Sequence, residues 1–160
     1  GFDWLDPTTL VVVDHGPSGE LERKGHDEVD VAQAGQNLGW PVVFGCETAE
    51  GKVAPVLSWE EAVPPGGVAI YTGSKISEWK GSVLVGTLAS KHLHRVVLEP
   101  GNPRKVKLHE VYLQGDMPNG LGRLREVVMG PDGELYVTTS NCDGRGECPA
   151  NKDLVARITR

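Results

Sequence analysis

A turn that leads into a β-strand is encoded by Pro131-Asp132-Gly133-Glu134-Leu135-Tyr136-Val137-Thr138-Thr139. The Asp-Gly pair favours a turn, and the residues from Leu135 onward are typical of a strand. Two other segments, residues 6–14 and 80–87, have the same form: a turn, then an apolar strand that ends in small polar residues. The chain therefore contains a weak internal repeat, and the repeated unit begins with a turn and a strand.

The other apolar runs are short and rich in β-branched residues, which favours strands over helices. They occur at residues 83–88, 93–98, 124–129 and 154–158, while residues 105–109 alternate strictly between polar and apolar. No window of about 11 or more residues has a convincing helical period. Glycine, at 21 of 160 residues, is about twice as frequent as usual, so turns are frequent as well. These features predict an all-β protein.

The spacing of the repeats favours a β-propeller. Leu10 and Leu135 are about 125 residues apart, close to three of the ~40–45-residue units typical of a propeller blade. About ten or eleven strands would form roughly two and a half to three four-stranded blades, which are too few to close a ring. We therefore expect a partial propeller. A β-sandwich with coincidentally similar turns is the alternative.

Composition excludes two classes of protein. The chain has 16 Lys and Arg against 22 Asp and Glu, a formal net charge of −6, and its scattered basic residues lack the clustering that holds a phosphate backbone. No run of ~18 apolar residues could span a membrane, and the N-terminus lacks the pattern of a signal peptide. We expect no nucleic-acid partner and no transmembrane segment. The abrupt start at residues 1–4 is typical of the interior of a larger protein.

A polar segment, Asp14-His15-Gly16-Pro17-Ser18-Gly19, follows the first repeated strand. Its glycines and proline break any sheet ladder. Such a turn can direct successive backbone carbonyls at one point, and Ca²⁺ binds carbonyl and carboxylate oxygens. The spacing of an EF-hand is missing. The segment is either part of a calcium site or an acidic surface loop.

Two arginines, Arg123 and Arg125, occupy alternate positions of a predicted strand and so extend from the same face. Two adjacent guanidinium groups repel one another unless an anion lies between them. A ligand with several carboxylates would suit this pair, because each guanidinium can bind a carboxylate through two hydrogen bonds. The alternative is pairing with Glu126 or another acid of the chain.

The three cysteines divide into a pair and a single residue. Cys142 and Cys148 bracket a short, glycine-containing loop that can bring them within disulfide range, and a disulfide would indicate an oxidising compartment. We expect Cys46 to be a buried free thiol.

Several aromatic side chains have two possible roles. Trp59 precedes a predicted turn at residues 64–67, and it could either stack on a sugar ring near a channel mouth or belong to the core. His92 and His94 share one strand face, and we interpret them as a surface pair rather than as a zinc site.

Six motifs occur in an order that resembles the C-terminal half of the soluble glucose/sorbosone dehydrogenase family, the aldose sugar dehydrogenases that depend on pyrroloquinoline quinone (PQQ). The motifs are Asp14-His15-Gly16-Pro17, His26-Asp27-Glu28, Gly35-Gln36-Asn37-Leu38-Gly39-Trp40-Pro41, Tyr71-Thr72-Gly73 with Glu78-Trp79-Lys80-Gly81, Gly122-Arg123-Leu124-Arg125 and Gly130-Pro131-Asp132-Gly133. The resemblance covers nearly the whole chain. It implies that residues 1–160 are the C-terminal half of a six-bladed β-propeller domain whose upstream blades are absent here.

The resemblance also implies a site in which PQQ lies over the central channel beside a calcium ion. By similarity, Gly16 and Pro17 would offer backbone carbonyls to that calcium. Glu28 is similar to an acid at an additional calcium site of the family. His15 matches a residue whose side chain borders the cofactor.

On the same basis, Arg123 and Arg125 match the arginine pair that holds PQQ carboxylates, and Trp59 matches an aromatic at the substrate entrance. The chain departs from some members at Ala89, where they have a cofactor-contacting lysine; Lys91 lies two residues further on. The insertion at residues 20–25 also lengthens the calcium loop.

The family's general-base histidine lies in an earlier blade. The histidines of this chain do not match it, so no catalytic residue is assigned here; they are His15, His26, His92, His94 and His109.

The implied activity is oxidation of an aldose sugar at C1 to the lactone by the intact parent protein, with an external electron acceptor, in the periplasm or outside the cell. The segment alone would be inactive without the remaining blades. Two other classes are possible. Propellers with this signature also occur as extracellular binding modules without activity, as in hedgehog-interacting proteins. A calcium-dependent sugar lactonase would need a cluster of carboxylate and amide ligands on inner strands, which the sequence does not contain.

Overall fold

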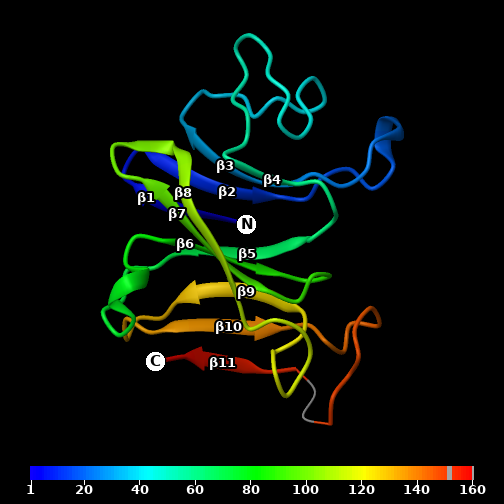
Figure 1. Ribbon diagram of the computed structural model, residues 1–160, viewed down its shortest axis with the longest axis vertical. Helices are drawn as coiled ribbons and strands as arrows, with labels where there is room; N and C mark the ends of the chain where they lie inside the picture. The colour runs from blue at the N-terminus through cyan, green and yellow to red at the C-terminus, as the bar shows by residue number, and fades with distance from the viewer. Residues whose placement is uncertain (151–152, 160) are drawn as a thin grey trace.

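The protein is built almost entirely from β-strands. The computed structural model describes residues 1–150 and 153–159, and these residues form three antiparallel sheets (Figure 1). The first sheet contains β1 (Phe2–Asp6), β2 (Thr9–Asp14), β3 (Asp27–Gln33) and β4 (Leu57–Trp59). The second contains β5 (Pro65–Ile70), β6 (Val83–Thr87), β7 (Leu93–Glu99) and β8 (Asn102–Tyr112). The third contains β9 (Leu124–Met129), β10 (Leu135–Thr139) and β11 (Val155–Ile158).

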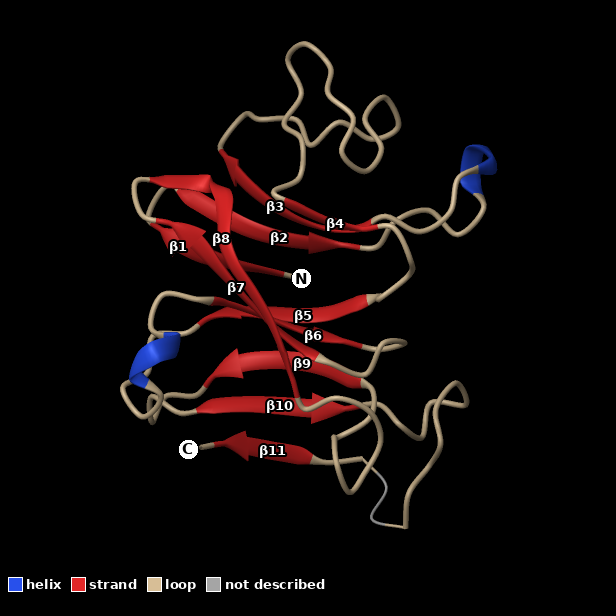
Figure 2. Ribbon diagram, viewed as in Figure 1, coloured by secondary structure: helices blue, strands red, loops and turns tan. Residues whose placement is uncertain are grey.

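Helical structure is confined to two single turns. They are the 3₁₀ helices Glu20–Glu22 and Ser77–Trp79, and no other helix occurs in the part of the chain that the structure describes (Figure 2). No helix among the described residues is long and apolar enough to cross a membrane. The prediction of an all-β protein is confirmed.

The three sheets lie side by side along the long axis of the molecule, each with its strands in chain order (Figure 1). The first strand of the second sheet, β5, packs against β1 on one side and against β9 on the other. First strands that adjoin in this way are the arrangement of successive blades in a β-propeller. The chain is thus a partial six-bladed β-propeller with about three blades, as predicted; the third blade has three strands in the described residues.

The internal repeat corresponds to the second strand of each blade. The three similar segments of the sequence become β2, β6 and β10, and each lies next to the first strand of its sheet. The predicted spacing was wrong, however. Leu10 and Leu135 are separated by two blade intervals rather than three, because long connections at residues 15–26 and 34–56 lengthen the first blade.

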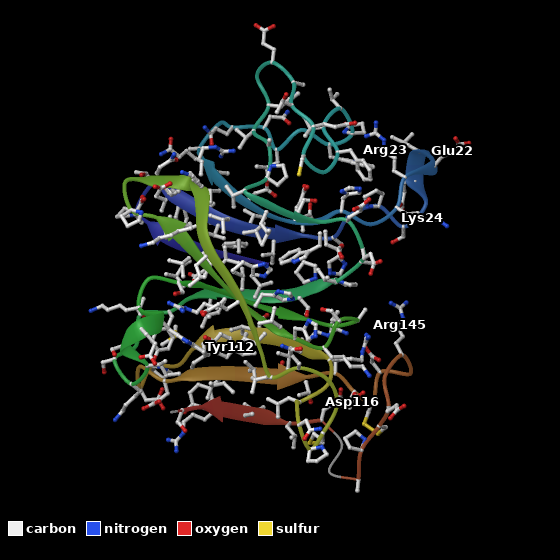
Figure 3. The ribbon with its side chains drawn as sticks, viewed as in Figure 1. Glu22, Arg23, Lys24, Tyr112, Asp116 and Arg145 are labelled. Carbon is white, nitrogen blue, oxygen red and sulfur yellow. A yellow bond between two sulfur atoms is a disulfide. The ribbon has the colours of Figure 1, made fainter. Side chains whose placement is uncertain are left out.

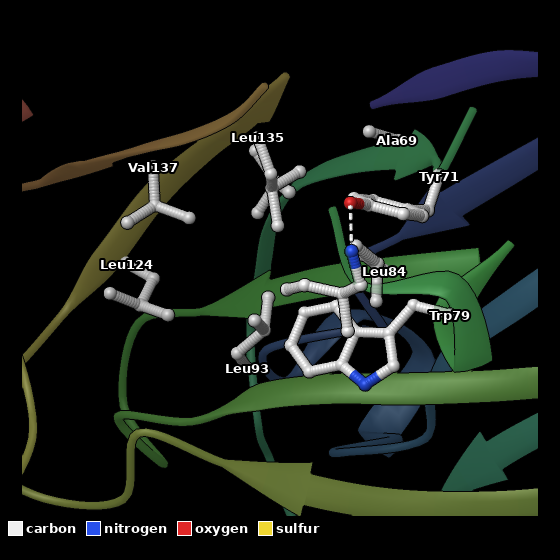
Figure 4. Close-up of a cluster of buried hydrophobic side chains, with 10 residues drawn as sticks. Ala69, Tyr71, Trp79, Leu84, Leu93, Leu124, Leu135 and Val137 are labelled. Carbon is white, nitrogen blue, oxygen red and sulfur yellow. Dashed lines mark hydrogen bonds between the residues drawn. The ribbon is translucent and has the colours of Figure 1, made fainter. Parts of the chain in front are cut away.

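Apolar residues fill the two interfaces between the blades. In β6, Val83 and Val85 face the first sheet while Leu84 faces the third, as the alternation of a strand requires. Because β6 is buried on both faces, it begins with three consecutive apolar residues, Val83 to Val85. Figure 4 shows the second interface, where Leu84 packs with leucines of the third sheet. Truncating such a leucine to alanine costs about 2–5 kcal/mol of stability.

The predicted turn at residues 64–67 is in fact the start of β5. Pro65 pairs with Thr87, and a bulge separates this pair from that of Gly67 with Gly86. Proline and glycine are tolerated here because a strand that begins at a bulge needs neither a regular ladder nor large side chains. This strand end is the point from which the candidate site is assembled.

Candidate functional site

The segments that carry the predicted site residues emerge at one end of the sheets, on the right in Figure 1. The connection after β2 and the loop after β10 leave from this end, while β5 and β9 begin at it. Figure 3 labels Arg23 and Lys24 in the first of these segments and Arg145 in the loop after β10, all on this side. The structure therefore brings segments that are distant in the sequence to a common edge.

The bend at His15, Gly16 and Pro17 is fixed by a buried aspartate. The Asp27 carboxylate accepts the Gly16 N–H at 2.8 Å with one oxygen and the Val63 N–H at 2.6 Å with the other. Gly16 has no room for a side chain, since a Cβ atom would lie 1.7 Å from the Gly25 carbonyl oxygen. Sequence reasoning gave Asp27 no role, because one of its two partners lies 36 residues away.

The bend and the arginine segment meet at the start of β5. The His15 ring donates from Nε2 to the Pro65 carbonyl oxygen at 2.9 Å. At the next residue, Gly66, the backbone of β9 approaches so closely that a Cβ atom would lie 2.4 Å from the Arg125 carbonyl oxygen. The bend belongs to the first sheet and the arginines to the third, so these two segments lie on blades that are not adjacent and approach one another at the start of β5.

A cavity of about 360 Å³ opens beside the bend. Four of the predicted residues line it, namely His15, Gly16, Pro17 and Glu28, together with Asp14. The structure thus brings together the residues that were assigned to calcium and the one assigned to the cofactor border. Trp59 and the two arginines are not part of this lining.

Acidic side chains gather along β2 and β3 behind this cavity. Burial, and then the charges of Asp30, Asp14 and Asp27, raise the pKa of Glu28 to about 8. Burial also raises the pKa of Asp30 to about 7, with a further contribution from Asp14 that Arg104 partly offsets. Asp30 is fully buried, and neither of its carboxylate oxygens has a hydrogen-bond partner among the described residues. The site favours a cation.

Side chains alone do not form a metal site here. Within residues 1–150 and 153–159, no three His, Cys, Asp or Glu side chains converge as metal ligands. A calcium ion at the bend would therefore need backbone carbonyl oxygens as well. The Pro17 carbonyl accepts the Gly25 N–H at 3.2 Å in this structure, and its second lone pair leaves it able to bind a cation.

Arg123 and Arg125 share one carboxylate of their own chain. Asp143 Oδ2 lies 3.0 Å from Arg123 Nη2 and 3.2 Å from Arg125 Nη2. The Arg145 N–H, followed by the Arg123 and Ser140 side chains, lowers the pKa of Asp143 to about 2. Pairing with an acid of the chain, the alternative left open by the sequence, is what the structure contains, with Asp143 in the place proposed for Glu126. Binding of PQQ carboxylates by this pair stays a prediction.

The predictions for the cysteines have different outcomes. Cys142 and Cys148 form a disulfide, with their Cα atoms 4.5 Å apart, which settles a pairing that the sequence left open. The prediction that Cys46 is buried is wrong, because Cys46 is exposed. It lies in the connection at residues 34–56, which forms no strand and projects beyond the first sheet in Figure 1.

Trp59 and the histidines meet between the first and second sheets. The Trp59 ring lies 5.0 Å from the ring of His94 and 6.0 Å from that of His109. Trp59 is half-buried on β4, the last strand of its sheet, and packs against the valine-rich core. Its role at a substrate entrance stays a prediction, and the geometry favours the core interpretation.

The interpretation of His92 and His94 as a surface pair is wrong for His94, which is buried. His94 Nδ1 lies 2.8 Å from His109 Nε2. Burial, and then the proximity of His109 and His92, lowers the pKa of His94 to about 3. Sequence alternation gave the correct shared face, but it could not show that β4 of the neighbouring sheet covers that face.

Lys91 follows the position where Ala89 replaces a lysine of some relatives. Its ammonium group forms an ion pair with Asp116, with Nζ and Oδ2 2.5 Å apart. Lys91 is therefore held on the connection between the second and third sheets.

Comparison with known proteins gives one consistent family. Residues 1–154 match the profile of the glucose / sorbosone dehydrogenase family. The aldose sugar dehydrogenase YliI of Escherichia coli is 30% identical over 145 residues, which cover 82% of this chain and 35% of that protein. The uncharacterized protein slr1608 of Synechocystis is 32% identical over 154 residues, which cover 88% of this chain and 34% of that protein.

Solved structures give the same result. A Thermus thermophilus oxidoreductase described as a glucose dehydrogenase superposes with a TM-score of 0.80 at 40% identity, covering 98% of this chain and 44% of that one. The PQQ-bound form of the aldose sugar dehydrogenase of Streptomyces coelicolor superposes with a TM-score of 0.76 at 28% identity, covering 99% of this chain and 42% of that one. The chain thus spans about a third of the length of the curated relatives and less than half of these structures.

Proposed function

Because the chain belongs to the glucose/sorbosone dehydrogenase family, we propose that it forms the C-terminal, cofactor-binding half of a PQQ- and calcium-dependent enzyme that oxidises an aldose sugar at C1 to the lactone. The observation that carries this proposal is the likeness over 99% of the chain to an aldose sugar dehydrogenase whose structure was solved with PQQ bound. Residues 1–160 are then the half of a propeller domain whose other blades complete the site.

The residues of this chain fit the two groups. PQQ carries carboxylates, and Arg123 and Arg125 provide a pair of cations converging on one anion position. Calcium prefers oxygen ligands, and the cavity at the bend is lined by Gly16 and Pro17, whose carbonyl oxygens we assign to the ion, and by Glu28. The acidic residues behind the cavity add a negative potential that favours a divalent cation there.

Each residue has a distinct part in this proposal. Arg123 and Arg125 bind and orient the cofactor through its carboxylates, and the His15 ring, held on the Pro65 carbonyl, borders it. Asp27 keeps the bend in position through the Gly16 N–H. PQQ would supply the electron-accepting quinone, and calcium would polarise its carbonyl group. Within this chain no residue is assigned as the general base, which we expect from an upstream blade.

The sugar substrate and the external electron acceptor would meet the cofactor at the end of the sheets where these segments gather. Trp59, on the last strand of the first sheet, is retained as the proposed aromatic at the substrate entrance. The disulfide between Cys142 and Cys148 supports a periplasmic or extracellular location, because such bonds persist in oxidising compartments.

The test uses the full-length protein that contains this segment, purified without cofactor and titrated with PQQ in the presence of calcium. Quenching of tryptophan fluorescence reports binding, and aldose-dependent reduction of a dye reports activity. We expect both signals in the wild type. Arg123→Ala should weaken PQQ binding about 10- to 100-fold, the loss of one or two charge-assisted hydrogen bonds, while the KM for the sugar changes less than about twofold.

Arg157→Ala is the matched control, since Arg157 is exposed on β11 and should leave PQQ binding unchanged. A wild-type protein that binds no PQQ would contradict the proposed function and favour a non-catalytic binding module of the hedgehog-interacting-protein type. Unchanged PQQ binding in Arg123→Ala would contradict the assignment of that residue alone.

A further inference from the structure

The loop closed by the disulfide between Cys142 and Cys148 lies against the arginine pair. It is closed on itself and anchored at its start. The disulfide joins its two ends, and the Asp153 carboxylate accepts the N–H groups of Asn141 and Cys142 at the start of the loop. Asp153 also accepts the Thr139 hydroxyl at the end of β10, so the loop is held to the sheet. Contacts other than those with the arginines therefore help to hold the start of the loop.

Inside this loop, Asp143 is the point where both guanidinium groups converge. Arg123 and Arg125 each direct Nη2 at the same oxygen, Oδ2. The Ser140 hydroxyl donates to that oxygen at 3.1 Å and accepts from Arg125 Nη2 at 3.1 Å. The other oxygen, Oδ1, accepts the Arg145 N–H at 2.9 Å, which fixes the carboxylate to the loop backbone.

Arg123 is enclosed by the same segment. Its Nε–H donates to the Ser140 carbonyl at 3.1 Å, and its backbone N–H donates to Asn141 Oδ1 at 2.8 Å. Gly146 lies against its side chain, since a Cβ atom there would be 2.5 Å from Arg123 Cδ. Arg123 is buried as a result, whereas Arg125 is half-exposed. No described residue contacts Nη1 of either arginine within hydrogen-bond distance.

The charges leave this cluster able to bind a further anion. Two guanidinium groups and one carboxylate give a net positive charge. Without Asp143 the guanidinium groups would repel one another and could separate. With Asp143 present, both guanidinium groups bind the same carboxylate oxygen, and their Nη1 nitrogens remain available to bind a ligand. A site that is held in its binding geometry beforehand loses less entropy when the ligand arrives.

We propose that the Cys142–Cys148 loop is a positioning device, in which Asp143 holds Arg123 and Arg125 in the geometry that binds the carboxylates of PQQ. This inference rests on the proposed function, because it concerns the same cofactor. Asp143 is a positioning residue that acts through the arginines, and the disulfide keeps Asp143 in place.

The experiment measures the dissociation constant of PQQ for the full-length protein by fluorescence titration, with the unfolding temperature of each variant recorded alongside. Asp143→Asn should weaken binding about tenfold, although it removes a negative charge, and Asp143→Glu should restore part of the affinity. The double variant Cys142→Ser, Cys148→Ser should weaken binding about three- to tenfold. The KM for the sugar should stay unchanged in all three variants.

Two controls separate positioning from charge and from thiol chemistry. Glu147→Gln removes the same charge from the same loop without altering a contact to the arginines, and Cys46→Ser removes the exposed free thiol. Both should bind PQQ within about twofold of the wild type. If the double serine variant does not fold, Ser140→Ala removes the hydroxyl shared by Asp143 and Arg125, and we expect a loss of about two- to fourfold.

Two outcomes distinguish this inference from the proposed function. If the wild type binds PQQ and Asp143→Asn binds it equally or more tightly, the proposed function stands and the positioning role is overturned, because Asp143 would then compete with the cofactor. If the wild type binds no PQQ, the proposed function fails and the inference fails with it.

Discussion

The first and third sheets bring charge to the same end of the molecule in opposite ways. In the first sheet, carboxylates gather beside the cavity, and burial together with their mutual repulsion raises the pKa of Glu28 to about 8. Asp30, behind them, has no hydrogen-bond partner among the described residues. In the third sheet, the two arginines already share the carboxylate of Asp143. The first region gathers carboxyl groups whose ionised form a cation would stabilise, and the second carries its own counter-ion.

The two regions therefore differ in whether they need a bound ligand to balance their charges. The bend of the first sheet is fixed by Asp27 and is electrostatically incomplete without a cation. The arginine pair is held by a loop and stays ordered without a ligand. We therefore expect the first region to respond mainly to calcium and the third mainly to changes in its loop. The following predictions apply to the full-length protein.

The largest expected effect is the loss of the aspartate that fixes the bend. Asp27→Ala leaves two partly buried N–H groups without an acceptor, at Gly16 and Val63, and should lower the free energy of unfolding by about 3 kcal/mol. Denaturation in urea, followed by circular dichroism, measures this change. Asp143→Ala should cost less stability, because Asp143 is partly exposed to water. Equal losses in the two variants would remove the contrast between the regions.

The strands that the sequence predicted well are those whose own residues determine them. β6, β9 and β10 are rich in apolar and β-branched residues, and they begin where the pattern predicts, at Val83, Leu124 and Leu135. By contrast, β4 has three residues and β5 begins with Pro65 and two glycines, so neither carries a local strand signal. These two strands depend on their neighbours in the sheet.

The candidate site was predictable to a similar degree. The resemblance identified the arginine pair and the bend, because their residue types are local. Asp27 and Asp143 were not identified, since their partners Val63 and Arg123 lie 36 and 20 residues away in the chain. A carboxylate whose partners are distant gives no sequence signal that distinguishes it from a surface acid.

Calcium gives the next largest expected effect. At about 100 times its dissociation constant, a bound ion raises the free energy of unfolding by about 2.7 kcal/mol. Calorimetry of the protein with calcium and with a chelator measures the shift. Glu28→Gln should reduce the shift, whereas Glu147→Gln, in the loop of the third sheet, should retain it in full. Magnesium should stabilise less, because it requires a stricter octahedral geometry. Identical unfolding temperatures with and without calcium would contradict a metal site at the bend.

Acid should weaken the interface of the first and second sheets more than that of the second and third. His94 lies in the former, and its pKa is about 3 in the folded protein, against about 6.5 when unfolded. Above pH 6.5 the imidazole is neutral in both states. Below it only the unfolded chain takes up the proton, so stability falls by up to about 1.4 kcal/mol per pH unit, about 2 kcal/mol by pH 5.

The variant His94→Leu isolates this contribution. Glu28 and Asp30 act in the opposite direction, because their raised pKa values let the folded protein take up protons first, so the measured quantity is the difference between wild type and variant. The difference should change between pH 6.5 and 5 and be constant above. Hydrogen exchange should show β3 and β4 opening before β9 and β10 in acid. A pH-independent difference would mean that His94 does not titrate as its burial requires.

The smallest expected effect concerns Lys91, which lies between the two regions. Its ion pair with Asp116 is partly exposed, so Lys91→Ala should cost less than about 1 kcal/mol of stability. If Lys91 made the cofactor contact that a lysine at the position of Ala89 makes in some relatives, Lys91→Ala would also bind PQQ more weakly. We expect unchanged PQQ binding, because the ammonium group is already paired with Asp116 on the connection to the third sheet. A weaker affinity of Lys91→Ala for PQQ in the fluorescence titration would extend the cofactor site to the second sheet. The contrast between the first and third sheets would then no longer describe the whole site.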